Sequence, residues 1–168
     1  EYQGGHAARW DLRNMKSEDI QPQKTAKEEK LRWNWNTPLL TGAKNPKNLY
    51  MGAQYLYKST DQGRNWTRIS NDLTTNDKNK QKQEESGGVT TDNSSAENHC
   101  TIFTVAESPL DGNSIYVGTD DGNLQITTDG GKTWTKALPS TAKGASGWTN
   151  TFSTGGAWVS SIEPSRLD

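Results

Sequence analysis

The sequence predicts an all-β fold assembled from repeated, four-stranded antiparallel units, and three observations carry this prediction. First, a hydroxyl residue, an Asp, a Gly and a Trp recur with the same spacing at residues 59–66 and 127–134. Second, each copy follows a short run that contains aromatic or β-branched residues, which favour strands. Third, only 29% of the residues are hydrophobic, whereas 16 are Gly and 7 are Trp, a composition that suits short strands and turns better than a helical bundle.

Each repeated stretch is expected to form a tight hairpin turn. The residues that recur are Ser59, Asp61, Gly63 and Trp66 in the first copy and Thr127, Asp129, Gly131 and Trp134 in the second. The Asp carboxylate can accept hydrogen bonds from N–H groups of the turn, as in Asx turns. The Gly supplies the positive φ, and the Trp begins the returning strand and packs under the turn. We call these stretches the first and the second repeated turn.

The pattern S-x-D-x-G-x-x-W resembles the Asp-box, or BNR repeat, of sialidase-like and sortilin (Vps10)-like β-propellers. The second copy departs from it only by Thr127, which keeps the hydroxyl group. In those families the Asp-box is a folding element on the hairpin between the third and fourth strands of a blade. The resemblance therefore implies a partial β-propeller of four-stranded antiparallel blades, in which Asp61 and Asp129 are structural and not catalytic.

A second repeat extends the turns into whole blades. The motif Tyr-x-Gly occurs at residues 2–4, 50–52 and 116–118, each time ahead of a further strand. The unit of four short strands has a period in the range of propeller blades. We expect strands near residues 35–41, 48–52, 55–59 and 66–69 in one blade, and near 101–107, 114–118, 123–127 and 134–137 in the next.

The chain therefore divides into full blades, partial blades and connectors. The expected order is a partial blade at 1–22 with its second strand at Tyr2–Gly4 and its third at 8–12, a full blade at 32–70, a long polar connector at 71–99, a full blade at 100–138, a Gly/Ser/Thr-rich excursion at 139–157, and the first strand of a further blade at 158–168, near 158–162. Closed propellers need roughly 4–8 blades. We expect the remaining blades of a larger protein, or other chains, to complete the ring. A small open β-sandwich is the alternative.

The connector at 71–99 is too polar to bury a core, and long loops of this kind are usually functional or disordered. Its charged run at 77–85 could form a short helix, with 79–85 as a solvated helical turn at the rim. We expect residues 86–99 to cross one face of the propeller and to help line a binding site, because they lead directly into an inner strand.

Strand topology groups the candidate binding residues on one face. In a four-stranded meander, the turns between strands two and three lie on the side of the connectors between blades, whereas the repeated turns lie on the opposite side. We call the first side the connector face. The candidate binding residues on it are His6, Trp33, Asn34, Gln54, Tyr55, Glu97, His99, Asp120 and Asp121. By analogy with the family, propeller ligands commonly bind on such a face.

Several of these candidates have a structural alternative. Asp120 and Asp121 stand in a sequence that is also typical of a hairpin turn. Trp33 suits core packing as well as stacking on a sugar ring. His99 and Cys100 could form a metal pair, but a chain with two His and one Cys favours a surface or capping His. We expect neither a metal site nor a cofactor.

Composition restricts the function. The net charge of −1 gives no field that would attract nucleic acid, and no apolar run reaches membrane-spanning length. The single cysteine, Cys100, excludes an internal disulfide. The family resemblance implies a secreted, periplasmic or cell-surface location.

Two function classes remain. The first is a non-catalytic, extracytoplasmic propeller segment that binds protein, peptide or glycan, within a larger sortilin-like BNR-repeat protein; the Tyr-x-Gly motif, the repeated turns and the E-S-P and I-E-P corners carry this resemblance. The second is a glycoside hydrolase of the sialidase or xyloglucanase type whose catalytic residues lie partly outside this chain. The arginines do not show the cluster that a sialidase would need, and no catalytic residue is assigned.

Overall fold

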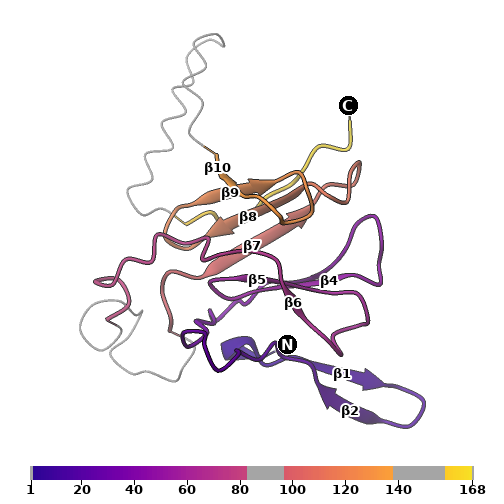
Figure 1. Ribbon diagram of the computed structural model, residues 1–168. Helices are drawn as coiled ribbons and strands as arrows, with labels where there is room; N and C mark the ends of the chain where they lie inside the picture. Colours follow the sequence, from indigo (N-terminus) through magenta and orange to yellow (C-terminus); the bar gives the residue numbers. More distant parts are fainter. Residues whose placement is uncertain (1, 83–96, 138–157, 168) are drawn as a thin grey trace.

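The computed structural model describes residues 2–82, 97–137 and 158–167. Two four-stranded antiparallel sheets form its centre (Figure 1). The strands of the first are β3 (Leu39–Thr41), β4 (Leu49–Gly52), β5 (Leu56–Ser59) and β6 (Thr67–Arg68). Those of the second are β7 (Ile102–Glu107), β8 (Ile115–Thr119), β9 (Leu124–Thr127) and β10 (Thr135–Lys136). The predicted all-β class and the four-stranded antiparallel units are thus confirmed.

Strand β3 begins later than the sequence suggested. Residues 35–38 were predicted as strand, but Asn34 folds them into a turn: its side chain accepts a hydrogen bond from the N–H of Asn36 (3.1 Å), and its carbonyl accepts one from the Thr37 hydroxyl (2.9 Å). Pro38 has no N–H to give to a neighbouring strand. The strand therefore starts at Leu39.

The first partial unit differs from the prediction at its beginning. Tyr2–Gly4 is not a strand; residues Gln3–Gly5 form the short 3₁₀ helix η1, in which Gly4 and Gly5 have φ values of 73° and 75°. The predicted strand at 8–12 is present as β1 (Ala8–Asp11), which pairs with β2 (Lys16–Asp19) in an antiparallel hairpin. The Tyr-x-Gly motif at residue 2 therefore lies in a helical turn before β1 and not in a strand.

Two further predictions concern the connector and the last segment. The described part of 77–85 contains a turn at 78–81 and no helix; the rest, with residues 86–96, lies outside the described residues, as does the excursion at 139–157. The predicted strand at 158–162 is not formed. Val159 gives one backbone hydrogen bond to Thr119 (3.1 Å), and the Trp158 ring packs on Phe103 with centroids 5.0 Å apart.

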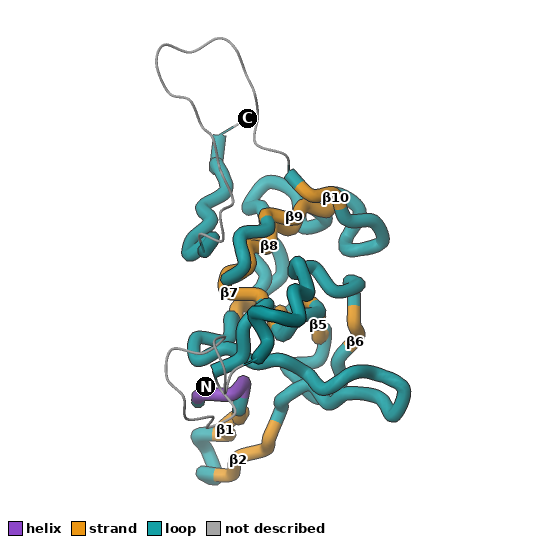
Figure 2. The backbone as a smooth tube through the Cα atoms, turned by 90° about the vertical axis from the view of Figure 1, so that its left-hand side faces the viewer, coloured by secondary structure: helices purple, strands orange, loops and turns teal. Residues whose placement is uncertain are grey.

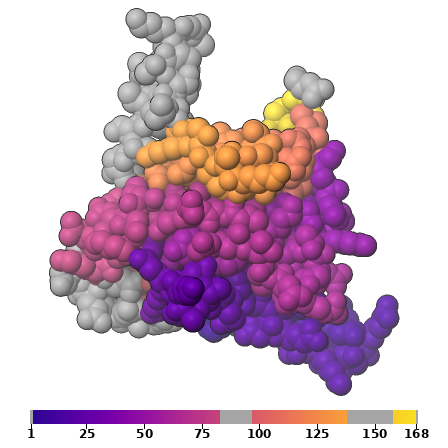
Figure 3. Space-filling view, in the orientation of Figure 1, coloured from indigo at the N-terminus to yellow at the C-terminus, as the bar shows by residue number. Residues whose placement is uncertain are grey.

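The sheets β3–β6 and β7–β10 pack against each other, and the β1–β2 hairpin extends from the other side of β3–β6 (Figures 1 and 2); Figure 3 shows the three surfaces as bands from indigo to orange. The central strands of the middle sheet, β4 and β5, are buried on both faces, and their successive side chains point to opposite sides. Met51 and Tyr57 belong to a core that also contains Ala7 and Ile20, the residues that flank the β1–β2 hairpin, whereas Tyr50 and Leu56 belong to a core shared with β7 and β8. Burial on both faces is what the packing of consecutive blades requires.

Both repeated turns have the predicted geometry. In the first, the N–H of Asn65 donates to the Asp61 carboxylate (2.9 Å) and the N–H of Gly63 donates to the Ser59 hydroxyl (2.8 Å). In the second, the N–H of Thr133 donates to Asp129 (2.9 Å) and the N–H of Gly131 donates to Thr127 (3.0 Å). The φ values of Gly63 and Gly131 are 85° and 98°.

The tryptophan of each repeated turn joins its own sheet to the preceding one. The indole N–H of Trp66 donates to the carbonyl of Ile20 (2.6 Å), directly after β2, and that of Trp134 donates to the carbonyl of Ile69 (2.9 Å), directly after β6. The Ile20 N–H donates to Ala7, and the Ile69 N–H to Leu56. The hairpin β1–β2 therefore corresponds to β5–β6 and forms the outer half of a third unit.

We expect the repeated turns to make the protein sensitive to acid. Hydrogen bonds from Asn65, and then from Ser59, lower the pKa of Asp61 from 3.8 to about 2; bonds from Thr133 likewise lower the pKa of Asp129. A lowered folded-state pKa gives stability that is present above the unfolded pKa and is lost as the pH falls through the folded value. Melting temperature should therefore decline between pH 3.8 and about 2. The double variant Asp61→Asn/Asp129→Asn should melt lower at pH 7 and vary less over this window; an unchanged slope would contradict this assignment.

The contact between a repeated turn and the preceding sheet can be tested at adjacent glycines. Gly130 and Gly131 both have positive φ, but a Cβ on Gly131 would lie 2.7 Å from the Ile69 carbonyl oxygen, whereas one on Gly130 would meet only Asn113, at 3.4 Å. Gly130→Ala should lower the free energy of unfolding by about 1–2 kcal/mol through backbone strain. Gly131→Ala should lower it by about 2–4 kcal/mol, because the clash with Ile69 adds to that strain. Equal losses in urea denaturation would show that the two sheets are not packed in this way.

Candidate functional site

The connector face is built around the turn between β8 and β9. Asp120 in this turn is fully buried. Its carboxylate accepts hydrogen bonds from the Thr101 N–H (2.8 Å), the Thr101 hydroxyl (2.7 Å) and the Asn34 side-chain amide (3.1 Å). Asp120 thus ties the turn to the start of β7 and to the segment that leads into β3.

Asp121 connects the same turn to Thr75, near the beginning of the 71–99 connector. It is 2% exposed and accepts hydrogen bonds from the N–H and the hydroxyl of Thr75, both at 2.7 Å, and from the Thr119 hydroxyl. These bonds hold the beginning of the 71–99 connector against β8. Both carboxylates therefore act inside the protein.

The pKa values of the two carboxyl groups are shifted in opposite directions. Burial raises the pKa of Asp120, against the hydrogen bonds from Thr101. Burial also acts to raise the pKa of Asp121, but the hydrogen bonds from Thr119 and Thr75 together outweigh it and lower that pKa. The negative charge of the pair is consequently held more firmly on Asp121.

Arg32 and Gln54 form the other half of this interior network. The Arg32 guanidinium donates to the Cys100 carbonyl (3.0 Å) and to Asp72 (2.6 Å). The Gln54 side chain accepts from the Arg32 N–H (2.8 Å) and donates to the Lys30 carbonyl (3.0 Å). The network fixes the segment before β3, the turn between β4 and β5, and the entry to β7 in one arrangement.

His99 and Cys100 lie side by side but lack the arrangement of a catalytic nucleophile and base. The His99 Nδ1 lies 3.8 Å from the Cys100 sulfur and 3.9 Å from Asp120, so one ring nitrogen faces both groups and no relay through the ring is formed. Burial, and then the charge of Asp121, raises the pKa of the Cys100 thiol to about 11. A thiol that stays protonated is a poor nucleophile. Among the described residues no group of three or more His, Cys, Asp or Glu could hold a metal ion.

The remaining predicted residues are distributed around this network. Trp33 and Glu97 are buried, and Trp33 packs in the core shared by the hairpin and the middle sheet. Tyr55 is half-buried, and the Arg68 guanidinium carbon lies 4.7 Å from the centre of the Tyr55 ring. His6 is exposed in the loop before β1. The structure thus brings Asn34, His99, Asp120 and Asp121 together, but leaves His6 and Tyr55 apart from them.

A pocket of about 280 Å³ opens on the connector face beside His99. The side chains that line it are Glu29, Lys30, Arg32, Gln81, Asn98 and His99. His99 is the only one of the predicted binding residues among them. The sequence also predicts Asn98 on this face, beside His99. It did not identify Glu29, Lys30, Arg32 or Gln81, because they lie outside the strands, where no periodicity marks a residue that faces a cavity.

The comparisons with known proteins concern the fold. No family model matches the chain, and no curated protein matches it. A GH74 enzyme from Niastella koreensis is similar over 83% of this chain and 19% of its own, with a TM-score of 0.51 and 23% identity. An ancestral GH74 enzyme (TM-score 0.42, 21% identity, 64% of this chain, 11% of that one) and YCF48 bound to a D1 peptide (0.22, 13%, 73% and 58%) are more distant. The chain spans about a fifth or less of the length of the two GH74 enzymes. The likeness to the Niastella enzyme shows a β-propeller-like fold.

The structural role of Asp120 leads to a stability prediction. In Asp120→Asn, an amide N–H₂ or a single carbonyl oxygen must face donors from Thr101 and Asn34, so at least one buried hydrogen bond is lost. The free energy of unfolding should fall by about 2–3 kcal/mol in urea denaturation. Asp111→Asn is the matched control, because Asp111 also accepts a backbone N–H but is exposed. Equal effects of the two substitutions would contradict the role given to Asp120.

Proposed function

We propose that the chain is a non-catalytic binding segment of a larger β-propeller protein. The observation that carries this proposal is the use of the connector-face carboxylates: Asp120 and Asp121 are buried and engaged with neighbouring segments. The pocket on this face is instead lined by two cationic and two amide side chains, together with His99 and Glu29. Such a surface suits recognition of hydrogen-bond acceptors better than bond cleavage.

The sequence motifs support a finer proposal. The repeated turns resemble Asp-boxes, and their internal hydrogen bonds give Asp61 and Asp129 a structural role. We infer a sortilin/Vps10-like BNR-repeat protein, located outside the cytoplasm, that is secreted, periplasmic or exposed at the cell surface. Further blades of the same protein, or other chains, complete the ring.

The pocket itself indicates which ligand groups would fit. Lys30 and Arg32 line it as cations, and Gln81 and Asn98 contribute amides that both donate and accept hydrogen bonds. Arg32 is already paired with Asp72, so Lys30 is the more available cation. A ligand with exposed carbonyl, hydroxyl or carboxylate oxygens, such as a peptide or a glycan, meets these requirements.

A glycoside hydrolase remains the competing function. Such enzymes need two carboxyl groups about 5–5.5 Å or about 6.5–9.5 Å apart that reach the glycosidic bond. The buried positions of Asp120 and Asp121 do not provide this pair. A second carboxylate from another part of the protein would also need a partner on this face, and the pocket offers only Glu29.

Binding and hydrolysis can be separated in one experiment. The protein is screened against glycan and peptide libraries and, in parallel, against a panel of aryl glycosides. We expect binding without turnover, and about a tenfold weaker affinity in Lys30→Glu because a rim charge is reversed. Lys24→Glu, which lies on the same segment between β2 and β3 but does not line the pocket, should bind as the wild type does. Aryl-glycoside cleavage that Glu29→Gln abolishes would establish the hydrolase instead.

A further inference from the structure

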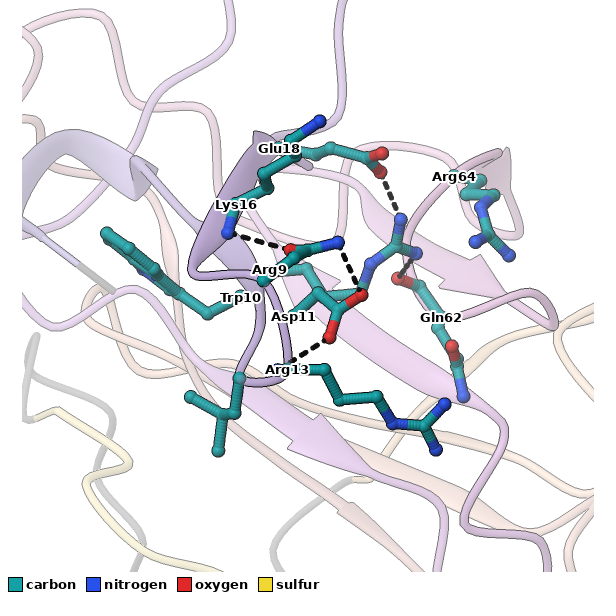
Figure 4. Close-up of a pocket in the computed structure, with 10 residues that line it drawn as sticks. Arg9, Trp10, Asp11, Arg13, Lys16, Glu18, Gln62 and Arg64 are labelled. Atoms are coloured by element: carbon teal, nitrogen blue, oxygen red, sulfur yellow. Dashed lines mark hydrogen bonds and ion pairs between the residues drawn. The ribbon is translucent and has the colours of Figure 1, made fainter.

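A second cleft lies on the side opposite the connector face and is larger than the pocket beside His99. It has a volume of about 460 Å³ and opens between the β1–β2 hairpin and the first repeated turn (Figure 4). The side chains that line it are Arg9, Trp10, Asp11, Leu12, Arg13, Asn14, Lys16, Glu18, Gln62 and Arg64. The turn at 12–15 connects β1 to β2, and the turn at 60–66 connects β5 to β6. Because these two hairpins correspond to each other in neighbouring units, both turns border the cleft from the same end of the strands.

The carboxylates in the cleft are already engaged. Glu18 pairs with Arg9, whose guanidinium also donates to the Gln62 carbonyl (3.1 Å). Asp11 accepts the N–H of Arg13 (2.9 Å) and the side-chain amide of Asn14 (3.0 Å). These contacts hold the hairpin tip in shape and fix it to the neighbouring turn.

The remaining charges are cationic and open to solvent. Four cationic and two acidic side chains line the cleft, which gives it a local charge of +2, although the whole chain has a net charge of −1. Within the described ranges, the side-chain ends of Arg13, Lys16 and Arg64 have no hydrogen-bond or ion-pair partner, and all three residues are exposed. Figure 4 shows Arg13 and Arg64 on either side of Gln62. Two unpaired guanidinium groups that line one cleft favour a ligand with carboxylates.

Exposed apolar side chains beside these cations indicate the kind of partner. The exposed fractions are 56% for Trp10, 79% for Leu12 and 66% for Met15, all on the same hairpin. Trp, Met and Arg are enriched at protein interfaces, where Trp and Arg often dominate the binding energy. A glycan would use the ring of Trp10 but would gain little from Leu12 and Met15. The surface therefore fits a polypeptide better than a carbohydrate.

We propose that this cleft binds an acidic, partly apolar segment of a partner protein. Carboxylates of the segment pair with Arg13 and Arg64, and its apolar side chains cover Leu12 and Trp10. The site is separate from the pocket of the proposed function, because it lies at the other end of the strands and shares no lining residue with it.

The two repeated turns provide a matched control. Arg64 in the first turn corresponds to Lys132 in the second, and both are exposed, but Lys132 does not line the cleft. The probe is a fluorescent peptide of alternating Glu and Leu with blocked ends, titrated by anisotropy at low salt. Arg13→Glu/Arg64→Glu should raise its dissociation constant about tenfold. Lys132→Glu, which changes the total charge in the same direction, should change it less than about twofold.

Additional measurements distinguish a specific acidic peptide from a nonspecific charge effect and from an acidic glycan. Added salt should weaken binding because exposed charges are screened, and the same peptide with Gln for Glu should bind much more weakly. Equal effects of Lys132→Glu and Arg64→Glu would overturn the proposal, since only overall charge would then matter. Binding of an oligouronate, but not the peptide, with loss in the Arg13 and Arg64 variant would also overturn it and would identify an acidic glycan. Lys30→Glu should leave peptide binding unchanged, so failure here is distinguishable from failure at the connector-face pocket.

Discussion

The arrangement of the sheets depends on one recurring hydrogen bond, from the indole N–H of a turn tryptophan to a carbonyl of the preceding unit. Trp66 reaches Ile20 and Trp134 reaches Ile69, each time directly after the last strand of the unit before. The Asp and hydroxyl side chains fix the conformation of the turn, so that the indole N–H lies within hydrogen-bond distance of the carbonyl in the preceding unit. The turn glycine lets the backbone approach, because a Cβ at Gly131 would collide with Ile69. Local turn chemistry and packing between units are therefore coupled.

The local half of this coupling could be predicted from the sequence, and the long-range half could not. The turns depend on contacts within five residues, such as that of Asp61 with Asn65, and short-range hydrogen bonds follow from residue type and spacing. Residue type and spacing also predicted the positions of most strands. The acceptor of the Trp134 indole lies 65 residues away, and nothing in the spacing identifies it. The errors at Tyr2–Gly4 and residues 35–38 arose where a loop conformation prevailed over a repeat match: positive φ at Gly4, and the turn that Asn34 caps.

The candidate site shows the same division. Topology correctly grouped Asn34, His99 and Asp120 near one another, since turns at one end of a meander converge. The burial of Asn34 and Asp120 could not be foreseen, because it depends on a long-range contact between them and on the hydrogen bonds of Asp120 to Thr101. Asn34 and Asp120, which the sequence predicted to contact a ligand, instead connect neighbouring sheets. Among the described residues, the surfaces that we propose for recognition are the pocket beside Lys30 and the cleft beside Arg64, at opposite ends of the strands.

Native-state hydrogen exchange of Trp134→Phe tests the role of the turn tryptophan most directly. Phenylalanine keeps an aromatic ring in the core but removes the donor to the Ile69 carbonyl. If the indole joins neighbouring sheets, protection should fall at the Ala137 amide, which bonds within its own sheet to Leu124, and also at the Ile69 amide, which bonds to Leu56 in the preceding sheet. A loss confined to Ala137 and the turn, with the Ile69 amide exchanging as in the wild type, would contradict this coupling between the sheets.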